Sequence, residues 1–213
     1  MRNIQKQAEP ASLTEHRCNQ HTDYDNYPDK DGLRESLVRE QHGICCYCLQ
    51  RIRPSEAEMK IEHWHAQSPN KYPNEQLNYD NLLGACRGGH GEKKGNQHCD
   101  TRKGDEDLTF NPSNPAHDVE ALFKFPGSGR IEPVSGDDDL ERQLNEVLNL
   151  NHSALVRNRK AVLDSFTDTL RRGKAKDSHL RKHLKEWTGS DGGTLDPFCQ
   201  VVVYYLRKKL KLA

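Results

Sequence analysis

The sequence is poor in apolar residues and has no long apolar run. Hydrophobic residues make up 33% of its 213 positions, and charged residues make up 30%. A chain this polar can bury only modest cores, so we expect something besides apolar burial to help hold it together. The longest apolar run, residues 201–206, is too short to cross a bilayer, and residues 1–6 lack the apolar stretch of a secretory signal. We therefore expect a cytoplasmic protein with no membrane partner.

Net charge is also lacking, because 32 Lys and Arg residues balance 32 Asp and Glu residues. Total charge therefore neither indicates nor excludes a nucleic-acid partner, but local charge is informative. Basic residues concentrate at 87–103, at 157–185 and in the tail at 207–211. Such stripes can neutralise phosphates, or they can be solvated helix faces, and the sequence leaves both interpretations open.

The distribution of apolar and turn residues predicts three parts in an α+β protein. Residues 1–30 are polar, with no clear periodicity, and we expect a loosely packed N-terminal arm. Residues 31–136 are rich in cysteine and combine short strands with short helices. Residues 137–213 follow a helical period and form a mainly helical C-terminal region.

Turn and capping residues predict where the elements begin and end. In the second part we expect a helix that stops at Gly43, strands over 59–64 and 82–85, a helix from Asp100, and a hairpin of residues 119–125 with 130–134. In the third part we expect a helix after Asp139, two helices capped by Asn151 and Asp177, and a last helix opened by Asp196.

Seven cysteines are an odd number, which argues against a disulfide framework in a cytoplasmic protein and favours metal binding. Cys45 and Cys48 form a C-x₂-C knuckle, and Cys86 and Cys99 bracket a Gly-rich loop further on. Two thiolates from the knuckle and two from this loop match a tetrahedral structural zinc site. Zinc binding to a small domain can supply on the order of 10 kcal/mol of folding free energy, which would compensate for a thin core.

Other residues compete with this ligand set or lie outside it. His90 and His98 are alternative zinc ligands, and Cys46 can exchange roles with Cys45. Cys18 and Cys199 have no partner in the pattern, and we expect both to be small buried residues. A closed four-cysteine site keeps no open coordination position, so catalysis would have to come from other residues.

Between the two cysteine pairs lies the dipeptide Glu62-His63. A carboxylate beside an imidazole offers a hard oxygen ligand for Mg²⁺ and a general base that works near neutral pH. Alternation along a strand would send the two side chains to opposite faces, unless the strand ends or bulges there. Alone, the dipeptide is weak support for a catalytic site.

The sequence segments around Glu62-His63 resemble those of the HNH endonuclease superfamily. Four segments follow one another in the family's order, namely C-x₂-C at 45–48, Glu-His with a following Gln-Ser at 62–68, Asp-Asn-Leu at 80–82, and Cys-Asp-x-x-Lys-Gly at 99–104. The resemblance implies a zinc-stapled ββα-metal (HNH) core within residues 31–136.

The resemblance also implies the roles of individual residues. His63 matches the general base that activates water, and Glu62 matches the first ligand of a catalytic Mg²⁺ or Mn²⁺ ion. Asp100 matches the second ligand, and Asn81 matches the residue that holds the histidine-bearing loop. The implied reaction is single-metal hydrolysis of phosphodiester bonds, in DNA or alternatively in RNA.

Three departures from the family pattern bear on the site. Cys86 and Cys99 are separated by twelve residues rather than a short gap, Ala66 replaces a common proline, and His65 follows as an extra histidine that we expect to pack. The inserted loop is basic, so the predicted contacts to substrate or a partner are Lys93, Lys94, Arg102 and Lys103, although a solvated lysine is an equal alternative for the last.

The long second knuckle, Glu62-His63-Trp64 and the Asn-Tyr-Asp-Asn-Leu run at 78–82 look like the retron- and Septu-associated PtuB-type HNH proteins of bacterial anti-phage systems. This resemblance implies an ABC/SMC-like ATPase partner, PtuA, and in retron versions a reverse transcriptase with its RNA–DNA product. Two alternatives remain from the residues alone. One is a zinc-stabilised nucleic-acid-binding or protein-binding module without activity, and the other is a cysteine redox switch.

Overall fold

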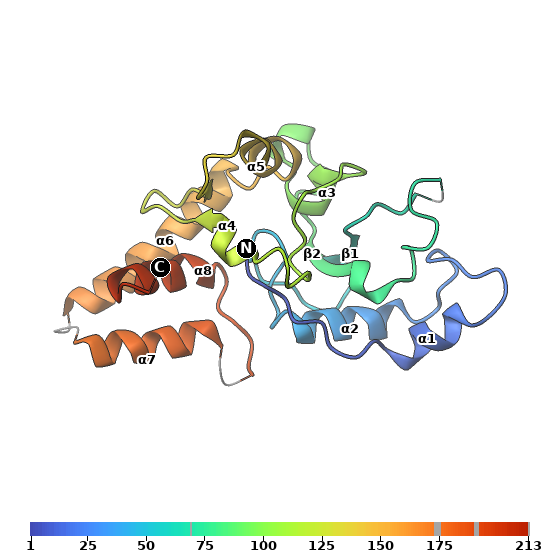
Figure 1. Cartoon of the computed structure of the whole chain (residues 1–213), viewed down its shortest axis with the longest axis horizontal. Helices are drawn as coiled ribbons and strands as arrows, with labels where there is room; N and C mark the ends of the chain where they lie inside the picture. The colour runs from blue at the N-terminus through green and yellow to red at the C-terminus, as the bar shows by residue number, and fades with distance from the viewer. Residues whose placement is uncertain (69, 173–175, 190–191, 213) are drawn as a thin grey trace.

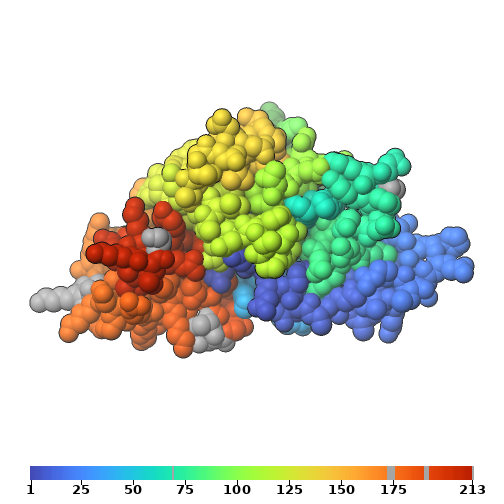
Figure 2. Space-filling view, in the orientation of Figure 1, coloured from blue at the N-terminus to red at the C-terminus, as the bar shows by residue number. Residues whose placement is uncertain are grey.

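The computed structural model of the chain describes residues 1–68, 70–172, 176–189 and 192–212. Figure 1 shows an elongated arrangement, with the first helices at one end, the last three helices at the other, and two small sheets between them. The space-filling view has the same order across its face, from the N-terminal segment to the C-terminal helices (Figure 2). Within the described ranges no helix is long and apolar enough to cross a membrane.

The central unit is a pair of strands with a helix on either side. The predicted strands are confirmed, because β1 (Met59–His63) pairs antiparallel with β2 (Leu82–Cys86). Helices α2 (Lys30–Glu40) and α3 (Cys99–Lys103) both pack against β2, whose five residues are all buried. The first of these helices ends at Glu40, three residues before the predicted stop at Gly43, and Gly43 adopts a φ of 74° that favours glycine.

The N-terminal thirty residues are more ordered than their polarity suggests. They contain α1 (Ala11–Arg17), and Met1, Leu13 and Tyr27 are buried. Leu13 and Tyr27 pack in one cluster with apolar residues of α2, so the expectation of a loosely packed arm is corrected. Cys18 follows the end of α1 and is exposed, which corrects the prediction that it is buried.

The predicted hairpin is only partly present. Strands β3 (Phe123–Lys124) and β4 (Glu132–Pro133) pair antiparallel, but residues 119–122 form the short helix α4 (Val119–Leu122). Glu, Ala and Leu in this segment are good helix formers, and the helix buries Val119, so helical structure replaces the first half of the strand.

The C-terminal region is helical as predicted, but its helices begin differently. Asn151 does not cap a helix; its side chain accepts from Ile131 N (2.9 Å) and donates to Ile131 O (2.9 Å), which ties it to the segment before β4. Asp177 is the first residue of its helix rather than the cap. Residues 196–198 form a turn before the last helix, because Phe198 adopts a left-handed conformation and its N–H binds Leu49 O.

The helices of this region run in three longer segments after a short irregular one. The predicted helix after Asp139 begins one residue earlier and continues into a π-helical segment. This region consists of α5 (Asp138–Arg142), η3 (Gln143–Val147), α6 (Ser153–Arg172), α7 (Asp177–Thr188) and α8 (Cys199–Lys209). Two short 3-10 helices, η1 (Tyr79–Asn81) and η2 (Lys94–Asn96), lie earlier in the chain.

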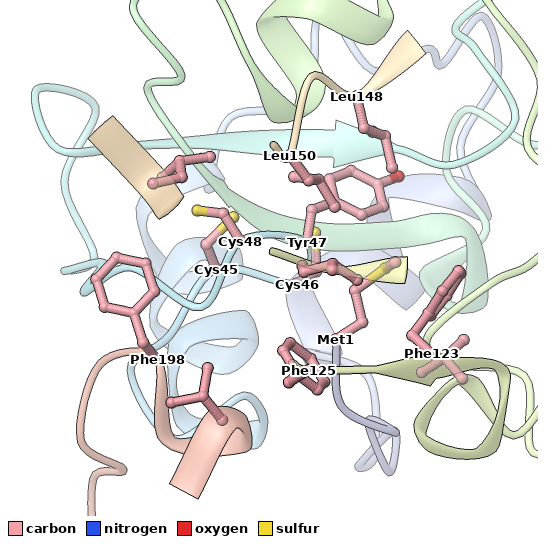
Figure 3. Close-up of a cluster of buried hydrophobic side chains, with 14 of the residues drawn as sticks. Met1, Cys45, Cys46, Tyr47, Cys48, Phe123, Phe125, Leu148, Leu150 and Phe198 are labelled. Atoms are coloured by element: carbon pink, nitrogen blue, oxygen red, sulfur yellow. The ribbon is translucent and has the colours of Figure 1, made fainter. Parts of the chain in front are cut away.

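One large buried cluster joins the cysteine-rich part to the helical part. It contains the knuckle residues 45–48, the aromatic rings of Phe123 and Phe125, Leu148 and Leu150, and residues of α8. In Figure 3 these side chains surround the knuckle from several elements. Because the cluster draws on both sides of residue 136, the position of the knuckle depends on the helices as well as on the strands.

Candidate functional site

Four cysteine side chains converge at one buried point. The Sγ atoms of Cys45, Cys48, Cys86 and Cys99 all lie within 4.8 Å of one another. Cys45 and Cys99 are 3.9 Å apart at sulfur, and Cys48 and Cys86 are 3.6 Å apart. A tetrahedron with Zn–S bonds of about 2.3 Å has sulfur–sulfur edges of about 3.8 Å, whereas a disulfide needs about 2.05 Å. The donor set and its spacing therefore fit a zinc ion.

Three different elements supply these ligands. The knuckle is a tight turn closed by the Cys45 N–H, which donates to Gln50 O (2.8 Å). Cys86 ends β2, and Cys99 opens α3 with a φ of 55°, a left-handed conformation that a cysteine rarely adopts. The Cys99 N–H donates to Leu148 O (2.8 Å), so the C-terminal region holds this strained residue in place.

The thiols differ in their tendency to ionise. Burial opposes ionisation of the Cys45 thiol, but hydrogen bonds from the surrounding thiols lower its pKa well below the usual value. Contact with Cys45 raises the pKa of Cys86, and burial raises the pKa of Cys99. Zinc binds thiolates, so its binding must release the remaining protons, and its affinity falls as the pH falls.

The alternative ligands do not join the four sulfur atoms. His98 lies beside them, with Nδ1 at 3.2 Å from Cys99 Sγ and 3.9 Å from Cys86 Sγ. His90 is exposed and lines a different pocket. Cys46 is a buried residue of the knuckle, but its sulfur is not one of the four that converge, and its N–H donates to Gly84 O.

Glu62, His63 and Asp100 line a common surface pocket of about 490 Å³. Glu62 and His63 are neighbours in β1, so regular alternation would separate them. His63 is the last residue of that strand, which lets both side chains reach the pocket. Asp100 comes from the first turn of α3.

The two carboxyl groups are held by a dense set of contacts. Glu62 is buried, and its Oε1 accepts from Tyr47 Oη at 2.7 Å and lies 3.1 Å from Lys103 Nζ. Asp100 Oδ2 lies 2.9 Å from Lys60 Nζ. Burial, then the adjacent Asp100, raises the pKa of Glu62 well above its usual value.

Asp100 ionises more readily than its neighbour. Burial opposes its ionisation, but hydrogen bonds from Glu62 and Lys60 lower the pKa of this carboxyl below its usual value. Glu62 therefore keeps its proton to a higher pH than Asp100 does. A cation bound between the two carboxyl groups would favour the ionised form of both.

His63 has a defined tautomer. Its Nε2 lies 3.0 Å from Gln76 O, and a carbonyl oxygen only accepts, so Nε2 carries the proton and Nδ1 is the free basic nitrogen. The ring of Tyr24 meets the imidazole edge-on, with centroids 4.5 Å apart. Burial lowers the pKa of His63, so the imidazole is neutral at pH 7.

Asn81 fixes the loop that follows His63. Its side-chain oxygen accepts from His65 N (2.7 Å), and its amide donates to His65 O (3.0 Å) and Glu75 O (3.0 Å). Its backbone carbonyl accepts from Trp64 N (2.9 Å). His65 itself stacks on Tyr72, with ring centroids 4.2 Å apart, in agreement with a packing role.

Lys103 is placed differently from what its position in the sequence suggests. Its side chain is fully buried, and Nζ contacts Glu62 and donates to His63 O (3.1 Å). The prediction of a surface contact to phosphate is therefore corrected. The Lys103 ammonium contacts the Glu62 carboxyl, and its hydrogen bond to His63 O holds the end of β1 in place.

The other predicted substrate contacts do not line this pocket. Arg102 donates to Glu146 O (2.9 Å) and Lys94 O (2.8 Å), so its guanidinium ties α3 to two neighbouring segments. Lys93 and Lys94 are exposed. Lys94 and Arg102 line a second pocket of about 930 Å³ that shares only Thr101, Gly104 and Asp105 with the first.

Sequence reasoning missed four residues at the carboxylate pocket. Tyr47 binds Glu62, Lys60 binds Asp100, and Tyr24 and Arg34 line the pocket. Of these four, only Lys60 could have been found from the sequence, since it lies two residues before Glu62 and so shares its strand face. The others reach the site only through tertiary packing.

The chain matches no protein-family model, and no curated protein shows significant similarity to it.

Proposed function

We propose that this protein is a metal-dependent endonuclease of the HNH type that hydrolyses phosphodiester bonds, in DNA first and alternatively in RNA. The observation that carries the proposal is the pocket in which a histidine with a free Nδ1 lies with two carboxyl groups. The ordered sequence segments that resemble the HNH superfamily support it further.

In the proposed reaction, His63 accepts a proton from the attacking water through Nδ1. The Gln76 carbonyl keeps the ring in the required tautomer, and Asn81 keeps the following loop in place. Positioning of this kind is most of what a protein contributes to phosphoryl transfer.

Glu62 and Asp100 would hold the catalytic Mg²⁺ or Mn²⁺. Their oxygens are the hard donors that such ions prefer. Tyr47 and Lys103 contact Oε1 of Glu62, and a hydrogen bond joins the Glu62 and Asp100 carboxyl groups, so an ion held by both would replace that hydrogen bond. A bound ion would polarise the scissile phosphate and stabilise the leaving 3′ oxygen. The four cysteines would hold zinc with a purely structural role.

Replacing His63 with alanine is expected to lower Mg²⁺-dependent cleavage about 10²- to 10⁴-fold, because a positioned general base contributes about that factor. Cleavage of plasmid DNA and of RNA is measured, with zinc content as a check that each variant is folded. The matched control is His65→Ala, two residues on, which should retain cleavage. Equal cleavage by the His63→Ala protein and the parent would contradict the assignment.

The pH dependence of cleavage gives a second expectation. An imidazole acts as a base only when it is unprotonated, so activity is present above its pKa and is lost as the pH falls through it. Burial lowers the pKa of His63 from about 6.5. The acid limb of the kcat/KM profile is therefore expected below pH of about 6.5, and a limb above that value would contradict the role of His63.

We also propose that the nuclease is the effector of a bacterial anti-phage system of the Septu or retron type, under control of a PtuA-like ATPase. This rests on the sequence resemblance alone. In retron systems the partners would include a reverse transcriptase and its RNA–DNA product. The cleavage assays are therefore repeated with the ATPase present. DNA binding without cleavage in both conditions would favour a zinc-stabilised binding module.

A further inference from the structure

The carboxylate pocket has a wall that does not come from the strands or from α3. Tyr24, from the N-terminal segment, and Arg34, from α2, both line it together with Glu62, His63 and Asp100. Nothing in the ordered HNH-like segments at 45–104 includes either residue. Their side chains add a cation and a hydroxyl donor to a pocket that holds a general base.

Arg34 is buried, but only part of its hydrogen-bonding capacity is satisfied. The residue is 9% exposed, and its Nη1 donates to Asp31 Oδ1 at 2.6 Å, while Asp31 itself has a side chain that is 83% exposed. Its Nε is buried without a hydrogen-bond partner among the described residues. Because Nε is closed off from solvent, it cannot donate to a ligand in the pocket. Nη2 is not closed off in this way and has no hydrogen-bond partner among the described residues, so it is the nitrogen that can donate to an acceptor there.

Tyr24 has a similar unused group. Its ring lies against His63, and Lys30 Nζ lies 4.9 Å from the centroid of the ring. Within the described part of the chain its hydroxyl has no hydrogen-bond partner. Burial raises the pKa of Tyr24 to about 12, so the hydroxyl keeps its proton and can donate.

An anion with several acceptor oxygens fits these donors. A guanidinium presents its N–H groups in a planar fork that matches phosphate oxygens, and such charge-assisted hydrogen bonds are stronger than neutral ones. A carboxylate ligand would offer only two oxygens and would not use the adjacent base. The negative charge of the bound group would also offset the burial of Arg34.

We propose that Arg34 and Tyr24 bind the phosphate group of the nucleic-acid substrate in this pocket, with Arg34 as the charged donor to its non-bridging oxygens. The inference rests on the proposed nuclease function, since it takes a phosphodiester as the ligand. It assigns to α2 and the segment before it a part in substrate binding, in addition to their part in the core.

The test uses the full, zinc-loaded chain with His63→Ala, so that DNA is bound but not cut. Adding Arg34→Gln is expected to weaken binding of a short DNA duplex about 10- to 100-fold, because a hydrogen bond to a charged group contributes about 1.5–3 kcal/mol. Arg39→Gln, on the same helix but outside the pocket, is the matched control and should bind like its parent.

A second duplex separates a phosphate contact from a structural effect. In a duplex with uncharged methylphosphonate linkages, Arg34→Gln should cause little further loss, and Arg34→Lys should restore part of the binding to the natural duplex. An equal loss on both duplexes, no loss on either, or no binding of the natural duplex by the His63→Ala protein overturns the proposal.

Cleavage by the protein with His63 intact is measured in parallel with Mg²⁺. Absence of cleavage, together with a loss of binding specific to the natural duplex, would refute the nuclease and leave the phosphate site standing. Normal cleavage by Arg34→Gln, with unchanged KM and kcat, would refute the phosphate site and leave the nuclease standing.

Discussion

Replacing Cys86 with serine is expected to leave the chain without zinc and without a stable fold at 25 °C. A serine hydroxyl is a poor substitute for a thiolate on zinc, and three sulfur atoms leave the tetrahedral site incomplete. Structural zinc contributes on the order of 10 kcal/mol or more in small domains, while whole domains are stable by only about 5–15 kcal/mol. The loss is therefore comparable to the total stability.

The local structure explains why so much would depend on a zinc ion at the four cysteines. β1 and β2 have five residues each, and α3 has five residues, so the central unit is too small to be stable through its own hydrogen bonds. The cluster that surrounds the knuckle also contacts residues of the C-terminal region. Loss of the ion would therefore disturb both halves of the chain rather than one loop.

Zinc content and circular dichroism of the purified proteins test this expectation, with about one zinc per chain expected for the parent. Cys46→Ser is the matched control, because Cys46 is a buried residue of the knuckle whose sulfur is not one of the four that converge. It should keep its zinc and lose much less stability. A folded Cys86→Ser protein that still binds zinc would show that another ligand, with His98 the nearest, completes the site.

The four-cysteine cluster and the two central strands could be predicted because their signals are local. A C-x₂-C knuckle brings two sulfur atoms together by its own turn, and the short apolar segment 82–85 fits a buried strand wherever it packs. His63 at the end of a strand was also a local possibility, and the strand ends there.

Features that depend on distant partners could not be predicted. Leu13 and Tyr27 are isolated apolar residues in a polar segment, and their burial follows from packing on α2. Lys103 has the sequence context of a surface lysine, but it is buried, and its ammonium contacts the Glu62 carboxyl of β1. Arg34 belongs to the pocket only because α2 packs beside β2, and helical periodicity does not reveal that neighbour.

Arg159 is the second residue whose replacement is expected to have a large effect. It is fully buried on α6, and its guanidinium donates to Gly129 O and Leu150 O, each at 2.6 Å. Burial lowers its pKa to about 10, so it remains charged at neutral pH, and the nearby sulfur groups of Cys48 and Cys99 act in the opposite direction. A zinc ion with four thiolates has a net charge of −2, so a nearby buried cation compensates part of that charge.

Arg159→Met is therefore expected to lower the free energy of unfolding by about 3–5 kcal/mol, the usual cost of removing one partner of a buried charge pair. It would leave two buried carbonyls without donors and the zinc centre without its counter-charge, so zinc should also pass faster to a chromogenic chelator. Urea unfolding and chelator transfer measure the two effects. Arg157→Met, exposed on the same helix, is the matched control. If both variants unfold and release zinc alike, Arg159 is only a packing residue; if Arg159→Met alone does so faster, the helical region stabilises the metal centre through charge as well as through contact.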